Sequence, residues 1–367
     1  MNEMIIANLL HRPIRSLISV MAIGLEVTLI LLIVGLSLGM LNDAQQRQAG
    51  IGADVIVQPP GSSFLSGITG APVSVKVADL LRKLPHVKIV TPVIMQLSTA
   101  GAVEVIYGID LKSFEQLSGP FQFISGGPFQ NPYDVIVDDF FAMTNKVKVG
   151  DTVQMFNHAF RVCGVVEHGK GARKFLQMST LQDLIGAQGK ASAFYVKLDS
   201  PDNANAVVNE IRAVPGLTTY AVRSMRDYIS MMTPANLPGL STFLDVVIGV
   251  AVTIGFIVIF QAMYAAVMER TREIGILKSL GASKLYIVDA VLRETFLLAV
   301  LGIVVGIIIS YVARSGIRER FPTLPMLLTG GWMLRATLIA VVGALIGASY
   351  PAFKAAQKDP IDALAYE

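Results

Sequence analysis

The sequence predicts an α+β membrane protein: a four-transmembrane-helix membrane domain with a large α+β extracytoplasmic domain inserted between helices 1 and 2. Three observations carry this prediction. Only 16% of the 367 residues are charged, against roughly 25% in soluble domains, and the mean hydropathy is +0.58. The apolar residues gather in four runs long enough to cross a bilayer. The polar-to-mixed segment 42–239 is long enough to bury a core of its own.

The apolar runs set the expected boundaries. In chain order we expect a cytoplasmic interfacial segment at 1–16, helix 1 at 17–41, the external domain at 42–239, helix 2 at 240–268, a cytoplasmic hairpin at 269–286, helix 3 at 287–312, an external loop at 313–335, helix 4 at 336–352 and a cytoplasmic tail at 353–367. The first run is too long for the apolar part of a signal peptide, and no Ala-x-Ala site follows it. We therefore expect it to remain as a membrane helix.

Basic residues set the expected orientation, because positive charge favours the cytoplasmic side. Four spans place both termini and the hairpin on one side, together with Arg12, Arg15, Arg270, Arg272, Lys278, Lys284, Lys354 and Lys358. The loop 313–335 opposes this assignment with Arg314, Arg318, Arg320 and Arg335. Because the first span usually dominates, we expect cytoplasmic termini.

The segment 42–239 alternates strand and helix patterns. The expected strands are Asp54–Val57, Val87–Val90, Val103–Tyr107, Tyr133–Val137, Thr152–Phe156, Phe160–Val166 and Ala193–Leu198. The expected helices are Val75–Leu84, Ser179–Ile185 and Pro201–Val214. This mixture indicates a folded α+β domain.

The charged hairpin between the second and third runs has features of a short amphipathic helix. Its apolar positions are Ile274, Ile276, Leu277 and Leu280, and Gly281 follows where a helix stops with a left-handed cap. We expect this helix at the cytoplasmic surface, offering an apolar ridge to a partner. An ordinary solvated loop is the alternative.

Polar residues inside or beside the spans are a second group of candidates. Asp289 and Arg293 are four residues apart and can pair on one helix face, with Glu294 next to them. Glu26 lies within the first span, where a carboxylate is a functional candidate. A proton relay needs further carboxylates at its depth, so a structural hydrogen bond is the favoured role for Glu26. The pairs Gly35/Gly39, Gly302/Gly306 and Gly343/Gly347 favour close helix packing in lipid.

Several kinds of chemistry find no support. Residues Gly164–Lys170 match the spacing of a phosphate-binding loop, but Gly171 stands where the magnesium-binding Ser or Thr would be, so we expect a turn after a strand. The four histidines show no metal-ligand spacing with each other or with Cys163. We expect no catalytic, cofactor-binding or metal-binding residues. A net charge of +3 without a basic face indicates no nucleic-acid partner.

Four stretches resemble one family. Glu269–Ala282 resembles the signature of the FtsX-like ABC transporter permeases, which include the MacB macrolide exporters and the LolC/LolE lipoprotein-release transporters. Asn8–Ser16 resembles the family's entry to its first span, and Pro351–Leu364 resembles its closing motif. Lys148–Val153 followed by Phe160–Val165 resembles its periplasmic core.

The resemblance implies a multi-pass permease of the bacterial inner membrane that works by mechanotransmission. Two such subunits, identical or different, would pair in membrane lipid, and a separate ABC ATPase would bind the ATP and dock on each hairpin. The implied ATPase-coupling residues are Glu269, Arg270, Arg272, Glu273, Ile274, Gly275, Leu277, Lys278, Leu280 and Gly281. We expect Ile274, Leu277 and Leu280 to form the docking ridge. The resemblance assigns no role to Glu26.

The resemblance leaves the cargo open. Export or extraction of a lipophilic, lipoprotein, peptide or drug cargo is the favoured function, with a periplasmic adaptor and an outer-membrane component as further partners that relatives use. The alternative is a non-transporting FtsX-type regulator that activates an extracytoplasmic cell-wall hydrolase. A membrane-anchored enzyme with its chemistry in 42–239 is a third class.

Overall fold

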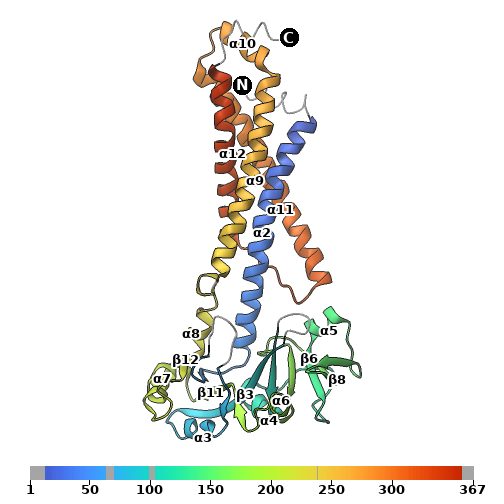
Figure 1. Ribbon diagram of the computed structural model, residues 1–367, viewed down its shortest axis with the longest axis vertical. Coiled ribbons are helices and arrows are strands. Elements are labelled where there is room, and N and C mark those ends of the chain that lie inside the picture. Colours follow the sequence, from blue (N-terminus) through green and yellow to red (C-terminus); the bar gives the residue numbers. More distant parts are fainter. Residues whose placement is uncertain (1–12, 63–69, 99–103, 238, 358–367) are drawn as a thin grey trace. The chain divides into compact units, whose positions relative to one another are not determined.

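Among the residues that the computed structural model describes (13–62, 70–98, 104–237 and 239–357), four helices are long and apolar enough to cross a membrane. They are α2 (Pro13–Ala49), α9 (Leu240–Glu269), α11 (Lys284–Arg320) and α12 (Gly330–Gln357) (Figure 1). The short helix α10 (Thr271–Ser279) follows α9 and precedes α11.

The helices are longer than the apolar runs alone indicate. Helix α2 continues past residue 41 to Ala49 because residues 42–49 combine alanine with polar residues that a helix tolerates. The expected loop 313–335 is helical through Arg320 and again from Gly330, so that expectation was wrong at both ends. The interfacial segment 1–16 and the tail 353–367 fall largely outside the described residues, as does the strand start expected at Val103.

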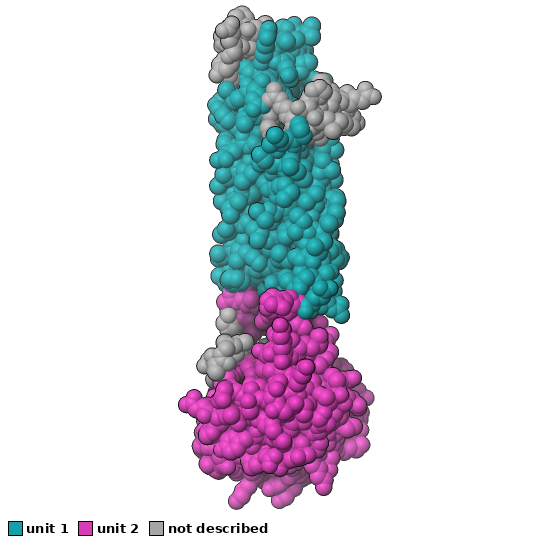
Figure 2. Space-filling view, turned by 90° about the vertical axis from the view of Figure 1, so that its right-hand side faces the viewer, with its two compact units in different colours: residues 1–37, 241–319, 326–367 teal, residues 38–240, 320–325 magenta. Residues whose placement is uncertain are grey.

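The chain divides into two compact units (Figure 2). Unit 1 comprises residues 1–37, 241–319 and 326–367, and unit 2 comprises residues 38–240 and 320–325. Helix α2 thus contributes residues to both units. The expected external domain, 42–239, lies within unit 2, which also takes in six residues, 320–325, from the expected loop.

Small residues bring the helices of unit 1 together. A Cβ added at Gly302 of α11 would lie 2.6 Å from the Cβ of Ile23 in α2, and one at Gly306 would lie 2.6 Å from the Gly24 carbonyl oxygen. The Thr28 hydroxyl donates to the Gly306 carbonyl at 3.1 Å. The pair Gly302/Gly306 therefore packs within the chain, against α2, as its spacing indicated.

Unit 2 is built on a mixed sheet. Its strands are β1 (Val55–Gln58), β3 (Val87–Ser98), β4 (Glu104–Ile109), β5 (Phe123–Gly126), β6 (Asp134–Asp138), β7 (Thr152–Met155), β8 (His158–Val166), β9 (Lys174–Gln177), β11 (Ala193–Leu198) and β12 (Ala221–Ser224). The strand order is β12-β1-β11-β3-β4-β9-β6-β8-β5, and β7 pairs with β8. The pairs β4/β9 and β6/β8 are parallel and the other pairs in this sheet are antiparallel. A separate two-stranded sheet joins β2 (Val73–Ser74) to β10 (Lys190–Ala191).

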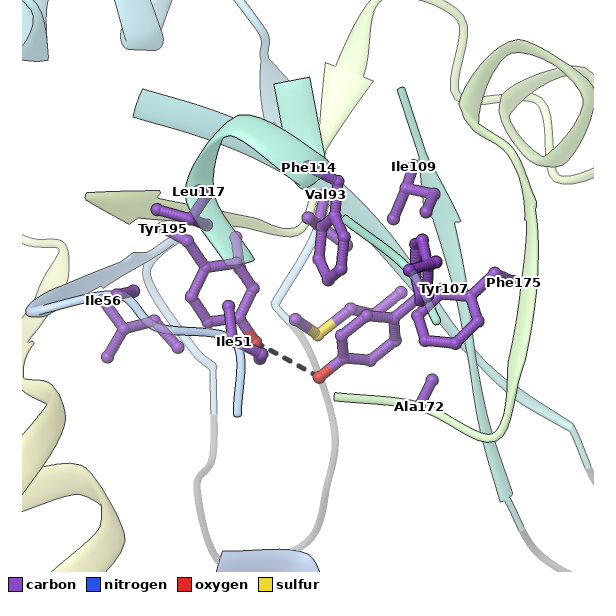
Figure 3. Packing of buried hydrophobic residues seen from close by; sticks show 14 of the residues in the cluster. Ile51, Ile56, Val93, Tyr107, Ile109, Phe114, Leu117, Ala172, Phe175 and Tyr195 are labelled. Atoms are coloured by element: carbon purple, nitrogen blue, oxygen red, sulfur yellow. Dashed lines mark hydrogen bonds between the residues drawn. The ribbon is translucent and has the colours of Figure 1, made fainter. Parts of the chain in front are cut away.

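Short helices accompany the sheet: α3 (Val77–Leu81), α4 (Leu111–Ser118), α5 (Asp139–Asn145), α6 (Met178–Leu184), α7 (Ala204–Ala213) and α8 (Met225–Ser230), with 3₁₀ turns η1 (Pro201–Asn203) and η2 (Pro234–Asn236). The core between them is apolar and aromatic (Figure 3). The buried Tyr107 and Tyr195 hydroxyls lie 3.2 Å apart and share a hydrogen bond. Burial raises the pKa of the Cys163 thiol to about 12, so this strand residue is an inert part of the core.

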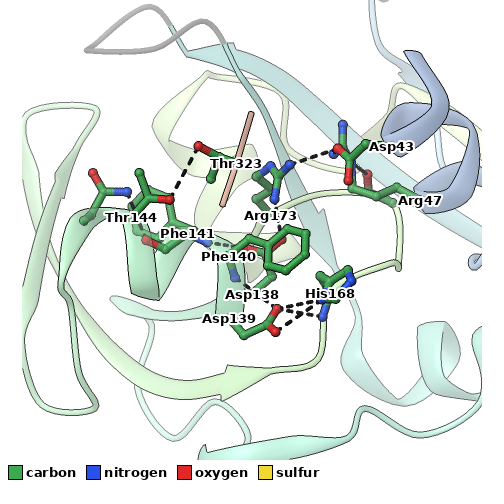
Figure 4. A network of polar contacts seen from close by, with 12 residues as sticks. Asp43, Arg47, Asp138, Asp139, Phe140, Phe141, Thr144, His168, Arg173 and Thr323 are labelled. Carbon is green, nitrogen blue, oxygen red and sulfur yellow. Dashed lines mark hydrogen bonds and ion pairs between the residues drawn. The ribbon is translucent and has the colours of Figure 1, made fainter. Parts of the chain in front are cut away.

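A network of charges ties the end of α2 to the sheet of unit 2 (Figure 4). Arg173 donates to Asp43 of α2 at 2.9 Å and to Asp138 at 3.1 Å, and Arg47 pairs with Asp43. Asp138 also caps α5 by accepting from the Phe141 N–H at 2.7 Å. Burial raises the pKa of Asp138 to about 6, and Arg173 and the Phe141 N–H offset only part of that effect.

The raised pKa of Asp138 predicts a pH dependence of stability. The folded state holds this proton more tightly than the unfolded chain, whose value is 3.8. The resulting stabilisation is full below the unfolded value and is lost as pH rises through about 6. Between about pH 5 and about pH 7.5, the wild type should lose on the order of 1 kcal/mol of unfolding free energy that Asp138→Asn retains.

Urea-dependent proteolysis of the full chain, read at cleavage sites in unit 2, measures this difference. Asn caps helices as well as Asp does, so the variant keeps the cap and removes the titration. It also removes the ion pair with Arg173, so the pH slopes are compared and not the absolute stabilities. Equal pH slopes for wild type and variant would contradict the assignment.

Candidate functional site

Helix α10 forms as the sequence indicated and ends at Gly281. The Ala282 N–H donates to the Leu277 carbonyl and the Gly281 N–H donates to the Lys278 carbonyl, each at 3.0 Å. Gly281 has φ +96°, which glycine adopts without steric cost. These two bonds and the positive φ make a Schellman cap. The left-handed cap expected at Gly281 is confirmed, and the hairpin is a helix, not a solvated loop.

An ion pair fixes the start of α10 to α11. Arg270, at the N-cap position, donates to both carboxylate oxygens of Glu294 at 2.9 and 3.3 Å. The two side chains are only 14% and 10% exposed. Such a two-point contact is directional, because the planar guanidinium matches the carboxylate. The structure therefore joins a residue expected in the coupling group to one expected as an intramembrane polar residue.

The inner face of α10 packs on the ends of the long helices. Gly275 is buried, and Ile274 packs on a cluster that includes Val267 of α9 and Ala352 of α12. The Lys278 ammonium donates to the Ala356 carbonyl at 3.0 Å, at the end of α12. Helix α10 thus contacts α9, α11 and α12, and its inner face is used within the chain.

The outer face of α10 exposes apolar side chains. Ile276 is 44% exposed and Leu280, one helical turn later, is 80% exposed. Leu285 and Tyr286, at the start of α11, are exposed as well. We call Ile276, Leu280, Leu285 and Tyr286 the apolar surface. The remaining predicted coupling residues Glu269, Arg272 and Glu273 are also exposed.

The three residues of the expected docking ridge, Ile274, Leu277 and Leu280, lie in different surroundings, and only Leu280 is fully exposed. Ile274 faces the bundle, and Leu277 is half-buried and lines a cavity. The reason is that small Gly275 and buried Thr271 let α10 approach its neighbours on the side that carries Ile274. Ile276, an apolar position of the predicted helix that was not among the expected coupling residues, is exposed beside Leu280, four residues later.

A cavity of about 320 Å³ lies between α9, α10 and α11. Its lining is mainly apolar and includes Met263, Leu277, Ile287 and Val291, together with the Arg270–Glu294 pair. Ile276 of the apolar surface belongs to the same lining. The cavity therefore adjoins the exposed face of α10.

The other predicted polar residues lie apart from this surface or have a different role. Arg293 pairs with Asp289 at 2.9 Å, as their spacing indicated, and both are about half exposed. Glu26 is buried in α2, and its Oε1 atom has no hydrogen-bond partner in the part of the chain that the structure describes. The structural hydrogen bond expected for Glu26 is therefore not found at that oxygen.

The phosphate-loop spacing at Gly164–Lys170 is accounted for within unit 2. Strand β8 ends at Val166, and a turn follows. The Lys170 ammonium donates to the carbonyls of Gly119 and Pro120 at 2.7 and 2.8 Å. A phosphate-binding lysine must reach its ligand, whereas this one is held by backbone carbonyls. The expected turn after a strand is confirmed.

Comparison with known proteins agrees with this architecture. The model of the MacB-like periplasmic core domain matches residues 16–214, and that of the FtsX-like permease C-terminal region matches residues 246–360. The "Macrolide export ATP-binding/permease protein MacB" of Shewanella sp. (strain W3-18-1) is 24% identical over 97% of this chain and 59% of its own length. This chain thus spans less than two thirds of that relative.

Two further relatives match parts of the chain. The "Uncharacterized ABC transporter permease YknZ" of Bacillus subtilis (strain 168) is 35% identical over 35% of this chain and 32% of its own length. The crystal structure of the periplasmic region of MacB from Actinobacillus actinomycetemcomitans has a TM-score of 0.38 at 17% identity, covering 50% of this chain and 94% of that structure. On the two family matches, which together cover most of the chain, this protein belongs to the FtsX-like ABC transporter permeases with a MacB-like periplasmic core domain.

Proposed function

We propose that this chain is the permease subunit of an ABC transporter and that α10 is its coupling helix, the docking site of a separate ATPase subunit. One observation carries the proposal: α10 is anchored on three membrane helices through its inner face while its outer face exposes Ile276 and Leu280 to solvent. Exposed apolar side chains grouped on one face are typical of a protein interface. Glu273 and Arg272 then supply polar contacts at its rim.

The anchoring of α10 supports its role in transmitting motion. A displacement imposed on the apolar surface passes to α11 through Arg270–Glu294 and to α12 through Lys278 and its backbone acceptor. Helices α2 and α9 lead by chain connection into unit 2. Nucleotide-driven movement of the ATPase would in this way move the extracytoplasmic domain, and the chain itself would bind no ATP.

Family membership supports a proposal for the assembly and its cargo. We propose a dimer of permease subunits in the cell membrane, exporting or extracting a lipophilic, lipoprotein, peptide or drug cargo. The named exporters among its relatives favour this function over the regulator of a cell-wall hydrolase. A periplasmic adaptor and an outer-membrane component complete the proposal for a Gram-negative cell.

Substitution of the apolar surface tests the coupling role. Leu280→Asp places a charge at the most exposed apolar position of α10 and should cost the ATPase interface about 2 kcal/mol or more, the loss typical of a buried interface anchor. Binding should fall roughly 30-fold or more. Co-purification of the tagged full chain with ATPase subunits from its own host, at matched expression, measures the change.

The matched control is Arg272→Ala, which removes an exposed charge from the same helix and should cost little, as rim charges do. Protease resistance of unit 2 should be unchanged in both variants, because neither residue contacts that unit's core. Retention of the ATPase by Leu280→Asp at wild-type stoichiometry would mean that α10 is only a structural connection.

The proposed orientation has its own test. In a Cys163→Ser background, Ser279→Cys on α10 should be protected from an impermeant thiol reagent added to intact cells, whereas Ala206→Cys on α7 should react. Both positions are exposed, so accessibility within the fold does not distinguish them. The reverse pattern would place α10 outside the cytoplasm and end its assignment as an ATPase-docking helix.

A further inference from the structure

Glu26 occupies an unusual position in unit 1. It lies in the first apolar run, is 4% exposed, and faces α9. Its carboxyl group rests directly on the backbone of Gly255, so that a Cβ added to this glycine would overlap the Oε2 atom. Any residue other than glycine at 255 would displace the carboxyl group. The two helices are therefore fitted to one another around this side chain.

The apolar segments of the four membrane-spanning helices offer Glu26 no positive charge. Its Oε1 atom has no hydrogen-bond partner in the described chain, and the apolar segments 17–41, 246–267, 295–312 and 336–352 contain no Lys, Arg or His. The nearby Thr28 hydroxyl is engaged by the carbonyls of Gly24 and Gly306. On α9 the carboxyl group lies against Gly255, which carries no titratable side chain.

An ionised carboxylate in this apolar setting is unfavourable, because no cation of these segments compensates its charge. A neutral carboxylic acid carries a much smaller desolvation cost. A metal cation would need several oxygen ligands, and no cluster of metal-ligating side chains occurs among the described residues. A single proton neutralises the carboxylate without further ligands.

We propose that Glu26 is a proton-binding site of unit 1. The carboxylic acid is neutral while it lies on Gly255, and it transfers its proton to water when α9 parts from α2 and water enters. We place the opening on the α9 side because the Glu26 carboxyl group lies against Gly255 of α9. The inference stands independently of the ATPase-docking proposal. If both hold, proton release reports the separation of α2 and α9 during the transport cycle.

Infrared spectroscopy tests the protonation state directly. The full chain is reconstituted in vesicles of phosphatidylethanolamine and phosphatidylglycerol at pH 7.5, and the spectrum of Glu26→Gln is subtracted from that of the wild type. Because the variant removes one carboxyl group, the difference must contain either the C=O stretch of a carboxylic acid or the stretches of a carboxylate. We expect the carboxylic acid band. The carboxylate bands would overturn the proposal, since they would show that Glu26 is ionised.

A glycine pair supplies a second test that keeps Glu26 itself in place. Gly255→Ala should shift or abolish the carboxylic acid band, whereas Gly249→Ala, on the same helix with no neighbour within 4 Å, should leave it unchanged. Gly255→Ala should also lower the thermal midpoint of the chain, and in a Glu26→Ala background this loss should shrink, because the two side chains no longer collide. An unchanged band in Gly255→Ala, or a loss of midpoint equal in both backgrounds, would show that Glu26 does not lie on Gly255.

Discussion

The Arg270–Glu294 ion pair is the constraint on which the arrangement of α10 depends. Both groups are largely buried, and breaking a buried pair by removing one partner typically costs about 3–5 kcal/mol because the other charge is left uncompensated. The pair holds the first residue before α10 on α11, and Lys278 holds the other end of α10 on α12. With both ends fixed, the helix can present only one face to solvent, and that face carries Ile276 and Leu280.

The same energetic cost of an uncompensated buried charge applies to the other charged groups of unit 1. Near the ends of the spans, carboxylates have cations within reach, as in the Asp289–Arg293 and Arg270–Glu294 pairs. Glu26, within the apolar part of α2, has no Lys, Arg or His in the apolar segments of the four spans, and its Oε1 atom has no hydrogen-bond partner among the described residues. Paired charges fix helices in place, whereas an unpaired carboxyl group is stable there only in its neutral form. Both proposals thus depend on how a buried charge is compensated. An ion pair positions the helix that carries the proposed coupling surface, and a proton neutralises Glu26 at the proposed proton site.

The sequence predicts the membrane helices well because length and hydropathy alone decide them, and it predicts the stop at Gly281 because only glycine suits a left-handed cap. It did not predict which face of α10 is exposed. Its apolar residues Ile274, Ile276 and Leu277, with the C-cap residue Leu280, share one broad face of roughly 160°. Contacts with other helices decide which part of that face is buried and which part is exposed. The Arg270–Glu294 pair joins residues 24 positions apart and has no local signal. The buried strand β9 was missed because it has only four residues and no alternation of polar and apolar side chains.

The most direct test of this account is to exchange the two charges of the Arg270–Glu294 pair. ATPase co-purification and the protease resistance of α10 are measured for Arg270→Glu, for Glu294→Arg and for the double variant. The account predicts that each single variant loses the ATPase and exposes α10 to cleavage, since two like charges then face each other, and that the double variant recovers most of both properties. Wild-type ATPase binding in the single variants, or a double variant as defective as the singles, would contradict the claim that this ion pair positions the coupling helix.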